Sequence, residues 1–411
     1  MTTPQPTRRT LLGGAAALAA TTVAGLGVDA AIAAPAAAAT GTTDLISADP
    51  IAHLLRRATF GPTPDSLAEA TRLGVAGWLD KQLNPAAIDD SELDALLTRL
   101  PLANGDVAAV RAKLAVHSYD AFGQLGRAAV ARAIWSNRQL FEAAAMFWAN
   151  HLHIAAPSGG VWDSRSDYDK SVTRKHTLGK FSDMLKASAR HPAMLTYLDQ
   201  RDSTKAHPNE NYARELMELH TVGMIYTEAD VQAAARLLTG MTVSTGGAYA
   251  YNTARHATGA VTVLGFSHPN ATADGGEQAV TAFLDYLAVH PATAQRIATK
   301  LCVRFVADEA PATLVAKLAK VYLDNGTAIA PVLKALFTSP EFAASIGQKV
   351  RTPFEDLTAA VRTLGLGIEP SGTKALDALY NNLVNAGNAP FRWNPPNGFP
   401  DVAAAWASPS A

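Results

Sequence analysis

Cysteine is nearly absent from this chain, which has one, Cys302, among 411 residues. A single cysteine excludes an internal disulfide, so a stable fold has to rest on its hydrophobic core. Charge is almost balanced, with 35 Lys and Arg against 36 Asp and Glu and a net charge of −1. Because no global field attracts polyanions, we expect no nucleic-acid partner.

The signature motifs of several enzyme classes are also missing. The sequence has no Walker loop, dinucleotide-binding glycine fingerprint, C-x-x-C pair, G-x-S-x-G elbow or H-E-x-x-H motif. These absences remove the motif-based routes to nucleotide binding, thiol redox chemistry, α/β-hydrolase chemistry and zinc proteolysis. The sequence therefore identifies no cofactor and no metal site.

The N-terminus has the pattern of an export signal. Arg8 and Arg9 precede an apolar run rich in Ala, Leu and Gly, and small residues near 31–39 offer cleavage sites. Paired arginines predict a cleaved twin-arginine signal over residues 1–39 and a secreted or extracytoplasmic location. The alternative is a retained anchor, but the run is short for a helix that needs roughly 20 strongly apolar residues. No later stretch is apolar enough, so we expect no transmembrane anchor after cleavage.

Helical periodicity runs through most of residues 40–411 and predicts a mainly α fold, a multi-helix globular domain. Apolar residues at helical spacing predict a long helix over 138–151, and Pro64 followed by acids predicts a helix start. Residues 241–265 are rich in Thr, Val, Gly and Tyr, which predicts a small β-hairpin or irregular insertion. We expect residues 40–411 to form a single large domain.

The densest polar cluster covers residues 209–220. A helix there would place its polar stripe beside its apolar face, with Glu210 and Arg214 paired four residues apart. Carboxylates in such a half-buried seam are candidates for general acid and base, since burial raises their pKa. The alternative is a salt-bridge network that fixes helix packing. The candidate site residues are Asn209, Glu210, Asn211, Arg214, Glu215 and Glu218.

A second cluster contains Asn150, His151 and His153 beside aromatic residues. His151 and His153 point in different directions on a helix and converge only if the helix ends there. A histidine among aromatics is more often a satisfied core residue, but imidazole is also a common catalytic group and ligand. We take His151 as a catalytic candidate and Asn150 as a substrate-binding candidate.

At these residues the sequence resembles the DUF1800 family of bacterial exported proteins. The resemblance extends through nearly all of residues 40–411 and its most specific string is N-E-N-Y-A-R-E-L at 209–216. It also includes the segments 53–61, 147–151, 191–199, 226–231, 235–240, 263–265, 290–294, 300–305, 339–342, 349–354 and 396–398. The resemblance implies an exported, largely helical protein and names no reaction.

The chain departs from the family pattern in three places. Residues 256–262 lack an acid and a lysine, His220 stands where an aromatic residue is usual, and Met241 stands where Trp is usual. The resemblance also implies further C-terminal helices, so residues 40–411 are expected to be a C-terminally truncated version of the domain.

Three hypotheses remain open on the sequence, and they leave enzymatic activity undecided. The first is a hydrolase of an extracellular or envelope polymer, with Glu215 and Glu218 as acid and base and with Arg214 and Asn211 positioning substrate or stabilising charge. It predicts a cleft that joins Asn150 and His151 to the 209–218 helix.

The second hypothesis is a non-enzymatic envelope-binding or scaffolding protein, which predicts no cleft at the seam and exposed apolar surface elsewhere. The third is a metal- or cofactor-loaded protein, suggested by the export route together with His151, His153 and the glutamates.

Overall fold

The structure is a computed structural model that describes residues 46–407. The proposed signal at residues 1–39 therefore lies outside the described residues. Helices dominate the described part of the chain, and the strands are short and form two separate antiparallel hairpins. The predicted mainly α fold class is confirmed.

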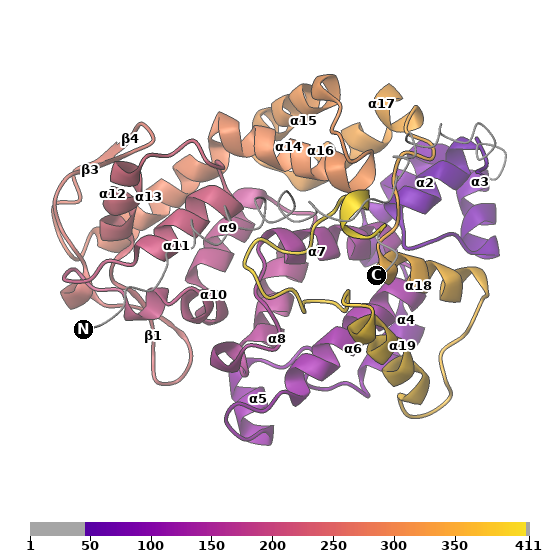
Figure 1. Cartoon of the computed structure of the whole chain (residues 1–411), viewed down its shortest axis with the longest axis horizontal. Coiled ribbons are helices and arrows are strands. Elements are labelled where there is room, and N and C mark those ends of the chain that lie inside the picture. The colour runs from indigo at the N-terminus through magenta and orange to yellow at the C-terminus, as the bar shows by residue number, and fades with distance from the viewer. Residues whose placement is uncertain (1–45, 408–411) are drawn as a thin grey trace, which may run out of the picture. The chain divides into compact units, whose positions relative to one another are not determined.

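The helices that begin the described part run through the right and centre of Figure 1. Their bounds are α2 (Pro50–Ala58), α3 (Pro64–Gln82), α4 (Ser91–Leu97), α5 (Val107–Lys113), α6 (Asp120–Trp135), α7 (Gln139–His151) and α8 (Arg165–Tyr168). The helix predicted over 138–151 is α7, and α3 begins at Pro64 as predicted. A proline fits the first turn because its missing N–H would have no helical partner there.

The middle of the chain combines helices with the two hairpins. The helices are α9 (Phe181–Arg190), α10 (Pro192–Tyr197), α11 (Glu210–Glu215), α12 (Glu228–Leu238) and α13 (Gly276–Val289). Strands β1 (Met241–Val243) and β2 (Tyr249–Tyr251) form one hairpin, and β3 (Val261–Val263) and β4 (Phe266–His268) form the other. The predicted insertion at 241–265 is thus two hairpins that together reach His268.

The remaining helices are α14 (Pro291–Phe305), α15 (Ala312–Asp324), α16 (Ile329–Phe337), α17 (Pro340–Ala343), α18 (Pro353–Thr363) and α19 (Lys374–Asn385). After α19 an irregular segment crosses in front of α7 and α8 (Figure 1). Thr352 and Glu355 form a capping box at the start of α18, and Thr227 and Asp230 form another at α12. Such reciprocal bonds satisfy backbone N–H groups that have no partner within the helix.

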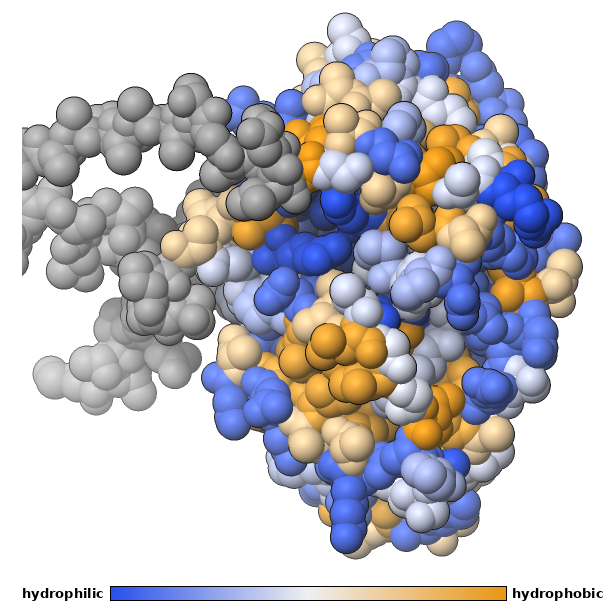
Figure 2. Space-filling model, turned by 90° about the vertical axis from the view of Figure 1, so that its right-hand side faces the viewer, coloured by the Kyte–Doolittle hydropathy of each residue, from blue (hydrophilic) through white to orange (hydrophobic). Residues whose placement is uncertain are grey.

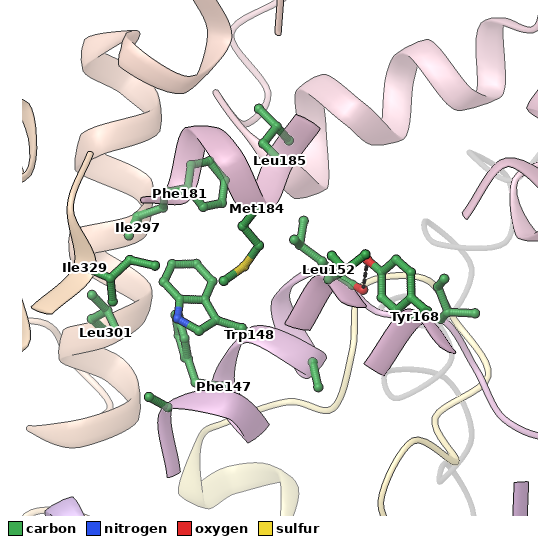
Figure 3. Packing of buried hydrophobic residues seen from close by; sticks show 14 of the residues in the cluster. Phe147, Trp148, Leu152, Tyr168, Phe181, Met184, Leu185, Ile297, Leu301 and Ile329 are labelled. Carbon is green, nitrogen blue, oxygen red and sulfur yellow. Dashed lines mark hydrogen bonds between the residues drawn. The ribbon is translucent and has the colours of Figure 1, made fainter. Parts of the chain in front are cut away.

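The core is centred on α7. Trp148 is 1% exposed, its ring lies 5.5 Å from that of Phe181, and its indole N–H donates to the Thr177 carbonyl at 3.1 Å. Figure 3 shows Phe147 and Trp148 facing Leu301 of α14. Buried apolar area stabilises a fold by roughly 25 cal/mol per Å², so these aromatic residues are major contributors. They also fix the last turn of α7, which carries Asn150 and His151.

Candidate functional site

His151 ends α7 in a fully buried position. It is 2% exposed, and its Nε2 lies 3.1 Å from the backbone carbonyl oxygen of His220. Because a carbonyl oxygen only accepts, Nε2 must carry the proton and Nδ1 is a bare acceptor. Nδ1 has no hydrogen-bond partner among the described residues. Burial, followed by the charge of Lys300, holds the pKa of His151 well below 6.5, so the ring is neutral.

Asn150 joins α7 to the C-terminal segment, which we define as residues 393–401. Its Nδ2 donates to the Phe399 carbonyl at 2.9 Å, and its Oδ1 accepts from the Phe399 N–H at 2.7 Å. Gly398 has a φ of +73°, and a Cβ there would lie 2.2 Å from the Asn150 carbonyl oxygen. Only glycine allows so close an approach in this conformation. The carboxamide is therefore occupied by the protein's own backbone.

Helix α14 presents three basic residues at four-residue spacing, Arg296, Lys300 and Arg304. Arg304 lies 2.8 Å from Glu355 and 3.6 Å from Asp401. Lys300, in contrast, has no hydrogen bond or ion pair within 4 Å in the described part of the chain. Burial, and next the charge of Arg296, lowers the pKa of Lys300 from 10.5 to about 8, while Asp401 acts in the opposite direction.

A cavity of about 270 Å³ lies between α7, α14 and the C-terminal segment. Its walls combine aromatic and apolar side chains with a few polar ones: Phe147, Asn150, His151, Lys300, Val303, Trp393, Asn397, Gly398, Phe399, Pro400 and Asp401. A smaller space of about 70 Å³ shares five of these residues. Mostly apolar walls with few polar groups are typical of small-molecule sites.

The residues at the start of the 209–220 cluster have structural partners or face solvent. The Asn209 side chain caps α11 by accepting from the Tyr212 N–H at 3.0 Å, and it donates to the Leu198 carbonyl at 2.7 Å. Glu210 and Asn211 are exposed. Asn209 therefore fixes the start of α11 and its packing on α10.

The acidic end of the cluster departs from a regular helix. After α11 the chain continues as a π-helical turn over Leu216–His220. Arg214 pairs with Glu228 at 2.8 Å rather than with Glu210. The Tyr226 hydroxyl donates to Glu218, and Glu215 is buried. Neither glutamate lines the 270 Å³ cavity.

The structure thus brings together part of the predicted site. Asn150 and His151 line the cavity, and His151 reaches the 216–220 turn through the His220 carbonyl. Asn209, Glu210, Asn211, Arg214, Glu215 and Glu218 do not line it. His153 turns away, with its Nε2 at 2.6 Å from the Trp393 carbonyl oxygen. Sequence reasoning missed Lys300, although it lies in the segment 300–305 on which the resemblance partly rests.

Another cavity, of about 260 Å³ and with more polar walls, is lined by residues of α4, α6 and α7 and of the π-helical turn Asp169–Arg174. Glu142 accepts two hydrogen bonds from Arg174, at 2.7 and 2.8 Å, and Arg132 donates to Asn104 at 2.9 Å. These charges have partners of their own. We therefore treat this cavity as part of a structural network.

Residues 46–407 contain no group of three or more His, Cys, Asp or Glu side chains placed to hold a metal ion. Among the same residues, no helix has the length and apolarity to cross a membrane. On the face seen in Figure 2, hydrophobic patches, one of them continuous near the middle of the face, are separated from one another by hydrophilic residues.

Comparison with curated proteins and with solved structures finds no significant match. A family model does match, over residues 53–411, and it is described as a protein of unknown function, DUF1800. The match contains the cavity-lining residues of α7, α14 and the C-terminal segment. The chain therefore belongs to the DUF1800 family.

Proposed function

We propose that this is an exported binding protein that captures one small unit of an extracellular or envelope polymer in the cavity beside Lys300. The observation that carries this proposal is the Lys300 amine, which has no hydrogen-bond or ion-pair partner within residues 46–407 and lies on the wall of a cavity with a mostly apolar surface. Such a cavity buries the body of a small ligand while a polar group fixes its orientation. A volume of about 270 Å³ suits one unit rather than a long stretch of chain.

Export is part of the same proposal and rests on Arg8, Arg9 and the apolar run that follows. A protein folded before export needs no disulfide, which agrees with a single buried cysteine. Replacing both arginines by lysine should leave the protein inside the cell. Secretion of that variant at the wild-type level would refute export by this route.

Hydrolysis is the second candidate, and the depressed pKa of Lys300, about 8, favours it. A lysine poised near neutral pH can take a proton from water as the water attacks an ester or amide carbonyl carbon, and it can return that proton to the alcohol or amine that leaves as the C–O or C–N bond breaks. In this version Lys300 transfers the proton, because Glu215 and Glu218 are not cavity residues. Asn150 is a positioning residue, since both of its polar atoms hold Phe399.

Capture of insoluble and soluble envelope polymers by the purified protein tests the proposal. Val303→Trp should fill the cavity and abolish capture, whereas Val289→Trp, at a half-exposed site on α13, should not. Equal capture by both variants would refute the cavity as the binding site. Release of soluble products by the wild type, and not by Val303→Trp, would favour the hydrolase.

A further inference from the structure

Four basic side chains lie at or near one wall of the cavity. His151 and Lys300 line it, and Arg296 lies one turn before Lys300 on α14. The buried Nε of Arg296 and the buried Nε2 of His220 have no hydrogen-bond partner within residues 46–407. Each of these four groups lies close enough to influence the titration of at least one other.

The nearest carboxylates have other partners. Asp401 lies 3.3 Å from Lys349 and 3.6 Å from Arg304, so its charge is shared between two other cations. Glu218, whose charge acts on Arg296, accepts a hydrogen bond from Tyr226. Lys300 therefore has no acidic partner of its own among residues 46–407, and the charge of Arg296 acts on it from the same helix.

We propose that the unit captured in this cavity carries an acidic group, a carboxylate or a phosphate, and that the Lys300 ammonium is its direct contact. This inference rests on the proposed capture function and names its ligand class. A charge-assisted hydrogen bond from Lys300 to an oxyanion supplies the missing counter-charge. The aromatic walls, Phe147, Trp393 and Phe399, then cover the uncharged remainder of the unit.

Arg296 has a different role in this site. It does not line the cavity, so it acts through its field on Lys300 and on the bound acid. Arg296 is thus a positioning and electrostatic residue. Arg296→Gln should weaken capture of an acidic unit less than Lys300→Met does. Added salt should reduce the contribution of Arg296 further, because salt screens longer-range interactions more strongly.

Matched small probes test the charge directly. Glucuronate and glucose differ by one carboxylate, and glucose 6-phosphate offers a phosphate on the same ring. Isothermal titration at constant ionic strength should detect both acids, and glucose should bind more weakly. Lys300→Met should weaken binding of the acids roughly tenfold or more, since hydrogen bonds to charged groups are the stronger class.

Lys320→Met is the matched control, because Lys320 is exposed on α15 and pairs with Asp324. It should bind like the wild type. Equal affinity for glucose and glucuronate, unchanged acid binding in Lys300→Met, or no binding of either acid by folded wild type would overturn the inference. If any of these results occurs while the wild type still captures polymer and Val303→Trp does not, only the acidic-ligand inference fails and the capture function holds. If the wild type captures no polymer, the proposed capture function itself fails.

Discussion

The carboxamide of Asn150 holds both backbone polar groups of Phe399, through contacts of 2.9 and 2.7 Å. These residues are separated by 249 positions in the chain, and each lies in or beside a segment on which the family resemblance rests. Their contact fixes the C-terminal segment against the end of α7. Because Asn150 and Phe399 both line the cavity, this contact holds two of its walls together.

Replacing Asn150 by Ala should destabilise the protein by about 2–4 kcal/mol. The change removes two hydrogen bonds and leaves a partly buried N–H and C=O of Phe399 without partners. Urea denaturation measures the difference. Asn382→Ala on the exposed face of α19 is the control and should change stability by less than about 0.5 kcal/mol. Equal effects of the two variants would contradict the role of this contact.

Gly398→Ala should cost more than another glycine replacement with the same backbone conformation. Gly398 and Gly372 have φ values of +73° and +72°, but a Cβ at Gly372 meets nothing within 4 Å. Gly372→Ala should therefore cost only about 1–2 kcal/mol, the ordinary penalty of a left-handed alanine. At Gly398 the new Cβ also meets the Asn150 carbonyl oxygen at 2.2 Å, which adds roughly 1–3 kcal/mol.

Thermal or urea unfolding of the two alanine variants measures this difference. Gly398→Ala should also reduce capture in the cavity, because it displaces a wall, whereas Gly372→Ala should not. If both variants lose the same stability and keep the same capture, the close packing of Gly398 on Asn150 has no energetic weight.

Local sequence patterns predicted the elements but not their irregularities. The helix expected over 138–151 occurs as α7, because its apolar spacing and its end at His151 are local properties. The helix expected over 209–220 instead becomes a π-helical turn after Glu215. That turn lets the His220 carbonyl reach His151. Such a contact depends on a distant helix, so no local pattern could indicate it.

The importance of Lys300 was hidden for a similar reason. Arg296, Lys300 and Arg304 at four-residue spacing are typical of a solvated helix face. Lys300 is instead half-buried and shares a cavity with residues 393–401, about a hundred positions later. Asn150 and His151 were found because they stand in one compact motif with their aromatic neighbours. Their role beside α14 required the tertiary fold.

Glu218→Gln tests whether the acidic cluster of residues 209–220 contributes to capture in the cavity or only to stability. The substitution weakens a hydrogen bond from Tyr226 to a charged acceptor, so it should lower stability by about 1 kcal/mol. Capture should be unchanged, because Glu218 does not line the cavity. Loss of capture at unchanged melting temperature would instead restore the acid–base role first expected for Glu215 and Glu218. Glu228→Gln, at the exposed partner of Arg214, is the control.

Lys300→Met should stabilise the protein below pH 8 while weakening its binding of acids roughly tenfold or more. Lys300 faces Arg296 on its own helix, His151 and His220 across the cavity wall, and Asp401 on the C-terminal segment. Burial and Arg296 disfavour its charge, and methionine keeps the volume without that cost. The pKa of about 8, against 10.5 in the unfolded chain, corresponds to at most about 3 kcal/mol.

The sign of the pH dependence follows from proton binding by Lys300. Between pH 8 and 10.5 the unfolded chain holds the Lys300 proton more firmly than the folded protein does, so this residue makes wild-type stability rise with pH. The advantage of Lys300→Met should thus be largest below pH 8 and should shrink toward pH 10.5. Urea denaturation of wild type, Lys300→Met and Lys320→Met at pH 7, 9 and 10 measures it, with Lys320→Met parallel to wild type. A constant difference between wild type and Lys300→Met would mean that Lys300 titrates as an ordinary exposed lysine, and the cavity would then lack the desolvated cation on which acid recognition depends.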